Sequence, residues 1–243
     1  MTDQQAQQKM LCKLLAGAQL PALPQSAIRV VELAKDPDNG PAEFAVPIES
    51  EPGLTSQVLR FVNSSYFGFP REISSVKLAI TLVGVRTIKN FVLWSAVYNM
   101  MPNPRCGGLD LGKLWQDSLR RGLFARVLGK AIGLRDTEEP FAAALLQDMA
   151  IPLLAKQLPD AYAKFFPARE RGNVRLSALE FEQFGWTHAD AAHQIADMWN
   201  LPAEFAVLMA HHNQWESLRE HMAVDQTQLV VTLSSLLPAS VDE

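Results

Sequence analysis

Apolar residues recur three and four positions apart along almost the whole of this chain, and almost no segment alternates apolar with polar residues. Spacings of three and four place side chains on one face of a helix, whereas a half-buried strand needs a period of two. One such helical stripe consists of Leu54, Val58, Leu59 and Val62. The pattern therefore predicts an all-α protein with short loops and essentially no strands.

Capping and helix-breaking residues set the limits of the expected helices. Ser74 or Ser75 is expected to cap one helix, which Gly84 ends. The segment PNPRCGGLDLG at 102–112 contains two prolines and three glycines, which predicts a boundary between two subdomains. Further helices are expected near residues 4–16, 24–34, 41–50, 85–101, 112–132, 138–156, 159–171, 175–183, 187–199, 202–212 and 223–237.

Composition and charge exclude several classes of protein. The 243 residues carry 22 basic and 26 acidic side chains, a net charge of −4, and the longest basic run is Arg120–Arg121, which argues against nucleic-acid binding. The apolar runs stop short of the roughly 18 residues that a membrane span requires. The two cysteines, Cys12 and Cys106, lie far apart, and the N-terminus lacks the apolar segment of a secretory signal, so a cytoplasmic location is expected.

All five histidines follow residue 187, and such clustering of a common metal ligand raises the hypothesis of a metal site. Their spacing does not favour one. His188 and His193 are five apart and diverge on a helix, and of the adjacent His211 and His212 at most one faces a given site. Polar or capping roles are favoured on spacing alone. Asp148 lies among apolar residues, so its carboxylate must meet water, a donor or a cation.

Longer motifs identify a family. LPALP at 20–24, Glu51 followed by PGLTSQVLRFVNSSYFG, and ISSVKLAITLVGVRTIKN at 73–90 occur in this order, followed by LWQDSLRRGLF, FAAALLQDMAIPLL and FGWTHADAAHQIADMWNLPAEFAVLMAHHN. Through these segments the chain closely resembles the bacterial HDOD domain over residues 13–213. The resemblance implies a two-lobed helical bundle that is HD-like. Residues 1–12 would be a helical extension, 13–102 and 110–213 the two lobes, and 214–243 a helix completing the second lobe.

HDOD domains are similar to HD-type metal phosphohydrolases, in which a His, a His-Asp pair, further His residues and a final Asp hold one or two divalent ions. By this resemblance the first His position falls on Asp117, the pair on Gln147–Asp148 and the final Asp near Ser235. A glutamine replaces an imidazole with one neutral oxygen, so the affinity for divalent ions is expected to be low. No metal is expected as a firm cofactor. A weakly bound divalent ion would be held by Asp117, Asp148, His188 and His211 or His212.

The incomplete ligand set, together with the absence of nucleophile and phosphate-loop motifs, predicts a protein without catalytic activity. The resemblance to HDOD domains implies that the protein has a role in signal transduction. By the resemblance it regulates through contact with another signalling protein in bacteria, with a homodimer as a further expectation. No nucleic acid, membrane or cofactor is expected. Two alternatives stay open: a residual metal-dependent phosphohydrolase, and a module that senses a nucleotide or other small ligand.

Candidate contact residues lie in the motifs RFVNSSYFG and VRTIKN, where polar and aromatic side chains accompany apolar helices. The same side chains can serve the fold instead. Asn63 can close a helix, basic side chains can cap carbonyls, and loop aromatics can pack on the end of a bundle. The candidates are Arg60, Asn63, Tyr66, Phe67, Arg86, Lys89 and Asn90.

Overall fold

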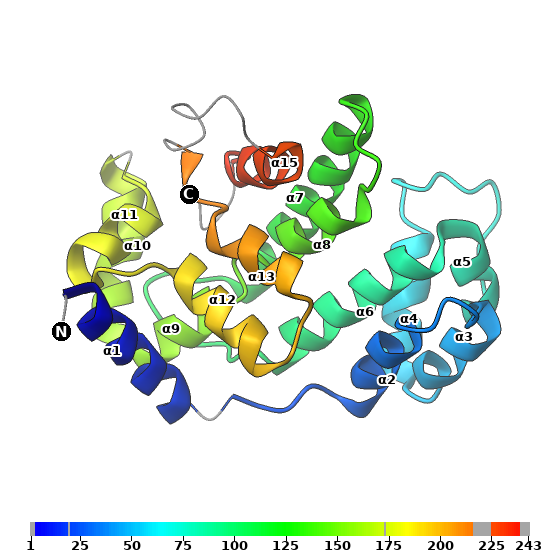
Figure 1. Ribbon diagram of the computed structural model, residues 1–243, viewed down its shortest axis with the longest axis horizontal. Coiled ribbons are helices and arrows are strands. Elements are labelled where there is room, and N and C mark those ends of the chain that lie inside the picture. Colours follow the sequence, from blue (N-terminus) through cyan, green and yellow to red (C-terminus); the bar gives the residue numbers. More distant parts are fainter. Residues whose placement is uncertain (1–2, 19, 173, 216–224, 239–243) are drawn as a thin grey trace. The chain divides into compact units, whose positions relative to one another are not determined.

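The computed structural model describes residues 3–18, 20–172, 174–215 and 225–238. Within these ranges the chain forms helices and no strand, which confirms the all-α prediction (Figure 1). The chain divides into two compact units, residues 22–100 and residues 1–21 together with 101–243. No helix in the described ranges has the length and apolar character that crossing a membrane requires.

The unit of residues 22–100 is built around one central helix. Along α6 every residue from Thr87 to Tyr98 except Lys89 is buried, as its apolar sequence predicts. Helices α2, α4 and α5 contact α6, and α3 packs on α2 and α5. The Phe91 ring of α6 stacks on the Phe61 ring of α4 with centroids 4.1 Å apart. The helices are α2 (Gln25–Leu33), α3 (Pro41–Glu49), α4 (Pro52–Val62), α5 (Val76–Val83) and α6 (Val85–Met100).

Two predicted local signals separate α5 from its neighbours. Ser75 Oγ accepts a hydrogen bond from the Leu78 backbone N–H at 3.3 Å, so Ser75 is the expected N-cap. Gly84 ends α5 with a φ of 91°, a backbone angle that side chains with a Cβ rarely adopt. The chain can therefore turn between two helices without a longer loop.

The larger unit contains the remaining helices, of which α7, α8, α13 and α15 pack together and α12 packs on α13. Gly122 lets α7 approach α8 closely, because a Cβ there would lie 2.8 Å from the Leu145 side chain. The helices are α1 (Asp3–Gly17), α7 (Leu111–Ala131), α8 (Glu138–Leu146), α9 (Ile151–Gln157), α10 (Pro159–Gly172), α11 (Leu176–Phe184), α12 (His188–Met198), α13 (Ala203–Ala210) and α15 (Gln226–Ser235).

The single helix expected over 138–156 is wrong, because the chain breaks after Leu146 and α9 begins at Ile151. Pro152 stands in the first turn of α9. In an unbroken helix its ring would clash with the carbonyl of Asp148, four residues earlier. The break leaves Asp148 in a turn between two helices, where its side chain is free of helical spacing.

The first lobe expected over 13–102 differs from the unit in the structure, which begins at residue 22 and ends at residue 100. Helix α1 packs on α12 in the larger unit, with Leu11 and Leu15 each 1% exposed. An amphipathic helix must bury its apolar stripe, but the stripe does not identify the partner. Of the segment 214–243, α15 lies in the larger unit, and residues 216–224 lie outside the described ranges.

Candidate functional site

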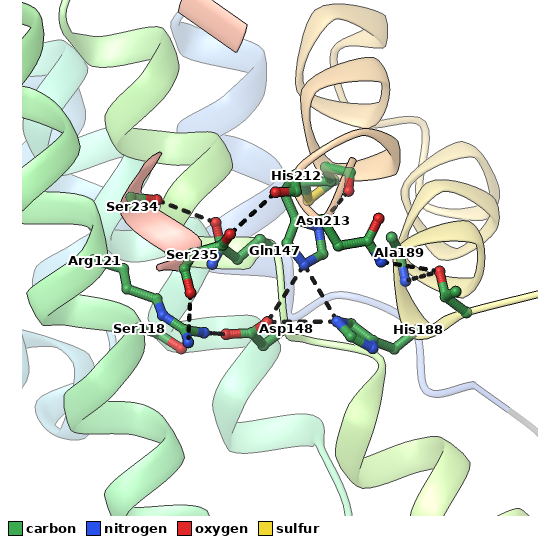
Figure 2. A network of polar contacts seen from close by, with 12 residues as sticks. Ser118, Arg121, Gln147, Asp148, His188, Ala189, His212, Asn213, Ser234 and Ser235 are labelled. Atoms are coloured by element: carbon green, nitrogen blue, oxygen red, sulfur yellow. Dashed lines mark hydrogen bonds and ion pairs between the residues drawn. The ribbon is translucent and has the colours of Figure 1, made fainter. Parts of the chain in front are cut away.

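Three possible ligand side chains converge in the larger unit. One ligand atom each from Asp148, His188 and His212 lies within 4.8 Å of the others (Figure 2). All three side chains are 0% exposed. Of the sequence-predicted set, the structure thus brings together Asp148, His188 and the second of the two adjacent histidines.

Each of the three residues stands at the end of a helix. Asp148 occupies the turn between α8 and α9, His188 is the first residue of α12, and His212 follows the end of α13. The start of α12 is held by a capping box, in which the Thr187 N–H donates to Asp190 Oδ2 at 2.8 Å and Thr187 Oγ1 accepts from Ala189 N at 3.2 Å. Helix ends allow residues far apart in sequence to point at one place.

Hydrogen bonds fix the orientation of both imidazoles. His188 Nδ1 lies 2.7 Å from Glu180 Oε2, and His212 Nδ1 lies 2.6 Å from the Met209 carbonyl oxygen. The Glu180 carboxylate also accepts from the His188 backbone N–H at 2.7 Å and from the Tyr162 hydroxyl at 2.5 Å. Since these oxygens accept, each Nδ1 carries the proton, and in the neutral rings each Nε2 bears a lone pair.

The two Nε2 atoms face each other and the Asp148 carboxylate. They lie 3.2 Å apart, and Asp148 Oδ1 is 3.8 Å from the Nε2 of His188 and 3.7 Å from that of His212. Asp148 Oδ1 is buried and has no hydrogen-bond partner. Three electron-pair donors therefore surround one small space.

A buried arginine occupies the other side of the carboxylate. The Arg121 guanidinium pairs with Asp148 Oδ2, and its second terminal nitrogen donates to the Ser235 carbonyl oxygen at 3.3 Å (Figure 2). Arg121 is 0% exposed. It places a fixed positive charge between Asp148 and Ser235, two positions that the resemblance matches to metal ligands.

Gln147, at the position of the family's missing histidine, packs against α15. Its side-chain oxygen accepts from Ser234 Oγ at 3.3 Å, while its amide nitrogen is buried without a partner. Ser235 Oγ lies 3.1 Å from the His212 carbonyl oxygen. These contacts tie α15 to the turns that carry Asp148 and His212.

The other two predicted ligands lie outside the cluster. Asp117 Oδ1 accepts from Arg120 at 3.0 Å. His211 is exposed, and its Nδ1 lies 2.9 Å from the Val207 carbonyl oxygen. The structure therefore chooses His212 where the spacing left His211 and His212 open.

Sequence reasoning missed two residues of the site, Arg121 and Glu180. Arg121 is four residues after Asp117, and residues with this spacing lie on the same face of a helix. The spacing could therefore have indicated that Arg121 faces the site. Glu180 is eight residues before His188 on the preceding helix, and no short-range pattern pairs the two. Both are fully buried charged side chains that the cluster requires as partners.

The candidate contact residues of the two motifs all lie in the unit of residues 22–100. Asn63 serves the fold: its amide donates to the carbonyl oxygens of Leu59 at 2.9 Å and Ile73 at 2.8 Å, and Oδ1 accepts from Ile73 N at 2.8 Å. The Phe67 ring packs edge-on against the Phe61 ring. The Tyr66 ring packs edge-on against Phe67, and Tyr66 is 38% exposed. Asn90 is buried, Lys89 partly buried, and Arg60 and Arg86 exposed.

Comparison with known proteins agrees with this architecture. The chain matches the HDOD domain over residues 20–215. The chain belongs to the HDOD family. An HDOD domain protein of unknown function from Geobacter sulfurreducens superposes with a TM-score of 0.78 at 19% identity, over 97% of this chain and 80% of that one.

Other HDOD-like structures share the fold at similar identity. A Shewanella amazonensis protein, provisionally named a phosphohydrolase, has a TM-score of 0.74 at 21% identity, over 91% of this chain and 78% of that one. A Marinobacter aquaeolei protein, provisionally named for signal transduction, has a TM-score of 0.73 at 20% identity, over 89% of this chain and 48% of that one. An uncharacterized Treponema pallidum protein is 22% identical over 196 residues, which are 80% of this HDOD chain and only 38% of that relative.

The HD-type resemblance implies a divalent ion, and the residues present fit one ion but not the full ligand set. Two ligands of a tetrahedral ion with bonds near 2.1 Å lie about 3.4 Å apart, close to the separations of 3.2 to 3.8 Å among the three donor atoms. On the other side of Asp148, the Arg121 guanidinium pairs with the carboxylate, and Ser235 offers a neutral hydroxyl where the resemblance places the final Asp. That side does not suit a cation.

Proposed function

We propose that this HDOD protein is a non-catalytic signalling module that acts through contact with another protein. The observation that carries the proposal is the Arg121 guanidinium beside Asp148. It stands among positions that hold metal ligands in HD-type hydrolases, and its charge repels an ion placed there. A phosphohydrolase of this type needs that ion to activate water and to clamp the phosphate oxygens.

Burial gives independent support. Asp148, His188, His212 and Arg121 are each 0% exposed. A hydrolytic centre must admit both a phosphate ester and an attacking water within bonding distance of the ion. A closed polar cluster instead stabilises the packing of the helices that carry it.

Contact with a partner is the function that remains for a folded HDOD unit without an open catalytic centre. The Marinobacter aquaeolei neighbour is provisionally named for signal transduction, and this chain covers 48% of it. The HDOD fold there is accompanied by further sequence, as expected of a module that works together with other protein parts. Tyr66, Phe67 and Phe69 form an aromatic loop after α4, in which the rings contact one another. The partly exposed Tyr66 on this aromatic loop is the candidate contact point.

A hydrolysis assay tests the non-catalytic claim. Bis-p-nitrophenyl phosphate and a panel of nucleotides are incubated with wild type, Asp148→Asn and Asp117→Asn in the presence of Mn²⁺, Fe²⁺ or Zn²⁺. We expect all three proteins to match the rate of metal alone. Turnover by wild type that Asp148→Asn abolishes and Asp117→Asn retains contradicts the proposal. A nucleotide that binds without turnover supports the sensing alternative instead.

Contact is tested in cells with a photoreactive phenylalanine analogue at Tyr66, and at the exposed Lys35 as the matched control. We expect a discrete cross-linked species, a second copy of this chain included, at position 66 and none at position 35. Equal labelling at the two positions, or none at either, contradicts a contact through the aromatic loop.

A further inference from the structure

We propose that a cleft between α2 and α3 binds a small monocarboxylate with an apolar body. The cleft has a volume of about 520 Å³, and its lining residues all belong to the unit of residues 22–100. Clefts that hold small ligands in proteins have volumes of about 300–1,000 Å³. The site includes neither the polar cluster around Asp148 nor the aromatic loop, so the inference goes beyond the proposed function and is tested separately from it.

The cleft extends along the pair of helices. Leu33 and Glu43 line it next to the turn that connects α2 with α3, and Ser26 and Ser50 line it at the far ends of the two helices. The helices contact each other along the chain between these residues. A ligand in the cleft therefore meets the first turn of α2 as well as the sides of both helices.

The first turn of α2 suits an anion. Its N-cap residue is Pro24, which makes no side-chain hydrogen bond to the first N–H groups of the helix. These groups carry partial positive charge and lack a capping acceptor. Ser26 in this turn is 6% exposed, and its Oγ has no hydrogen-bond partner among the described residues. A buried hydroxyl without a partner is costly, and a carboxylate oxygen of a ligand supplies that partner.

The charged residues of the lining match one negative charge. Arg29, one turn after Ser26, is exposed and lies 3.4 Å from the exposed Glu32, a pairing that is weak in water. Its guanidinium can therefore turn to a ligand carboxylate, which it binds through two parallel hydrogen bonds. Glu43 on the other helix accepts from the Gly40 N–H at 2.9 Å. A second negative charge on the ligand would meet this carboxylate and be repelled.

Apolar side chains line the cleft beside these polar groups. Leu33 and Pro47 are buried, whereas Val46 is 69% exposed. An apolar ligand body that covers Val46 removes this surface from water, which is favourable. Ser26 and Leu33 are separated by two turns of helix, roughly 10 Å along its axis, a length that a chain of about eight carbons spans.

The test is a titration of ¹⁵N-labelled full-length protein with octanoate, followed by the NMR shifts of the backbone amides. Octan-1-ol and octylamine carry the same apolar body with a neutral or a cationic head. We expect octanoate to shift the amides of residues 25–29 and to saturate with a Kd on the order of millimolar or tighter. The alcohol and the amine should bind at least roughly tenfold more weakly, because neither offers an ionised acceptor.

Two variants separate recognition of the charge from general stickiness. Arg29→Gln should weaken octanoate binding roughly tenfold. Arg71→Gln is its matched control, because Arg71 is an exposed arginine of the same unit that does not line the cleft, and its octanoate affinity should equal that of wild type. Val46→Asp places a negative charge and removes an apolar contact at an exposed position, so it should abolish octanoate binding without unfolding the unit.

The amide spectrum of each variant first establishes that it is folded. Wild type without saturable shifts in residues 25–29 overturns the inference. Equal affinities for octanoate and octan-1-ol also overturn it, because the carboxylate is then not recognised. An octanoate affinity that Arg29→Gln leaves unchanged, or that Arg71→Gln lowers as much, does the same.

Discussion

At the scale of single residues, two arginines of α7 make a natural comparison. Arg121 and its partner Asp148 have fully buried side chains. Arg126 pairs with Glu138 at 2.8 Å, with side chains 10% and 17% exposed, and lies over the Phe141 ring. Removing one partner of a fully buried pair leaves an uncompensated charge, whereas a partner near solvent can be rehydrated. The first pair is therefore the more sensitive to substitution.

We expect Arg121→Met to lower the free energy of unfolding by about 3–5 kcal/mol, because it leaves the buried Asp148 carboxylate uncompensated. Arg126→Met, the control on the same helix, loses less, because Glu138 lies nearer to solvent and can be rehydrated. Urea unfolding of both variants measures the difference. An equal loss in the two variants contradicts the fully buried pairing of Arg121 with Asp148.

The residues of the site were predictable only in part. Asp148 was predictable as a site residue because a carboxylate among apolar residues needs a partner. His188 was predictable because it lies in a motif that matches the family. The choice between His211 and His212 depends on the turn after α13, which no spacing rule describes. Arg121 and Glu180 join the cluster through contacts between helices, so their roles become visible only when those helices are packed.

At the scale of helices, the close approach of α7 and α8 places Arg121 against the turn that holds Asp148. Gly122, next to Arg121, makes this approach possible, since a Cβ would lie 2.8 Å from Leu145 and 3.2 Å from Phe141. The break between α8 and α9 at Pro152 then turns the Asp148 side chain into the cluster. The missing side chain of Gly122 and the ring of Pro152, which prevents α8 from continuing, thus shape the site.

Gly122→Ala is expected to lower the free energy of unfolding by about 1–3 kcal/mol through overpacking, despite the better helix propensity of alanine. Gly53→Ala in α4 is the control, because nothing lies within 4 Å of its added Cβ. That variant should be neutral or slightly stabilising. Urea denaturation of both variants gives the comparison, and a Gly122→Ala protein as stable as wild type would contradict the close packing of α7 on α8.

At the scale of the whole molecule, the larger unit is built from two separate stretches of the chain, because α1 belongs with the residues that follow position 100. The smaller unit is one continuous stretch between them. Cys106 lies in the larger unit just after this boundary, buried, with Sγ 3.4 Å from the Pro159 carbonyl oxygen. Burial raises the pKa of the Cys106 thiol, and the nearby Asp160 charge adds to the effect. Cys12 on α1 is exposed.

These two thiols should react at clearly different rates with a thiol reagent. At a given pH a raised pKa means less thiolate, the reactive form, so Cys106 should react later in a rising pH series than Cys12. Denaturant should remove the difference. The Cys12→Ser variant isolates the slow thiol, and Cys106→Ser isolates the fast one. Two thiols of equal rate in the folded protein would contradict the burial of Cys106.

The amino-acid sequence by itself determined that this protein is helical, where most helices begin and end, and to which family it belongs. These properties follow from periodicity, capping and ordered motifs, which act between neighbours along the chain. Only the tertiary structure decided that α1 joins the larger unit, that α8 and α9 are separate, that His212 and not His211 joins Asp148 and His188, and that Arg121 pairs with Asp148. Such meetings depend on which apolar faces bury each other, and many pairings satisfy one apolar pattern until packing selects among them.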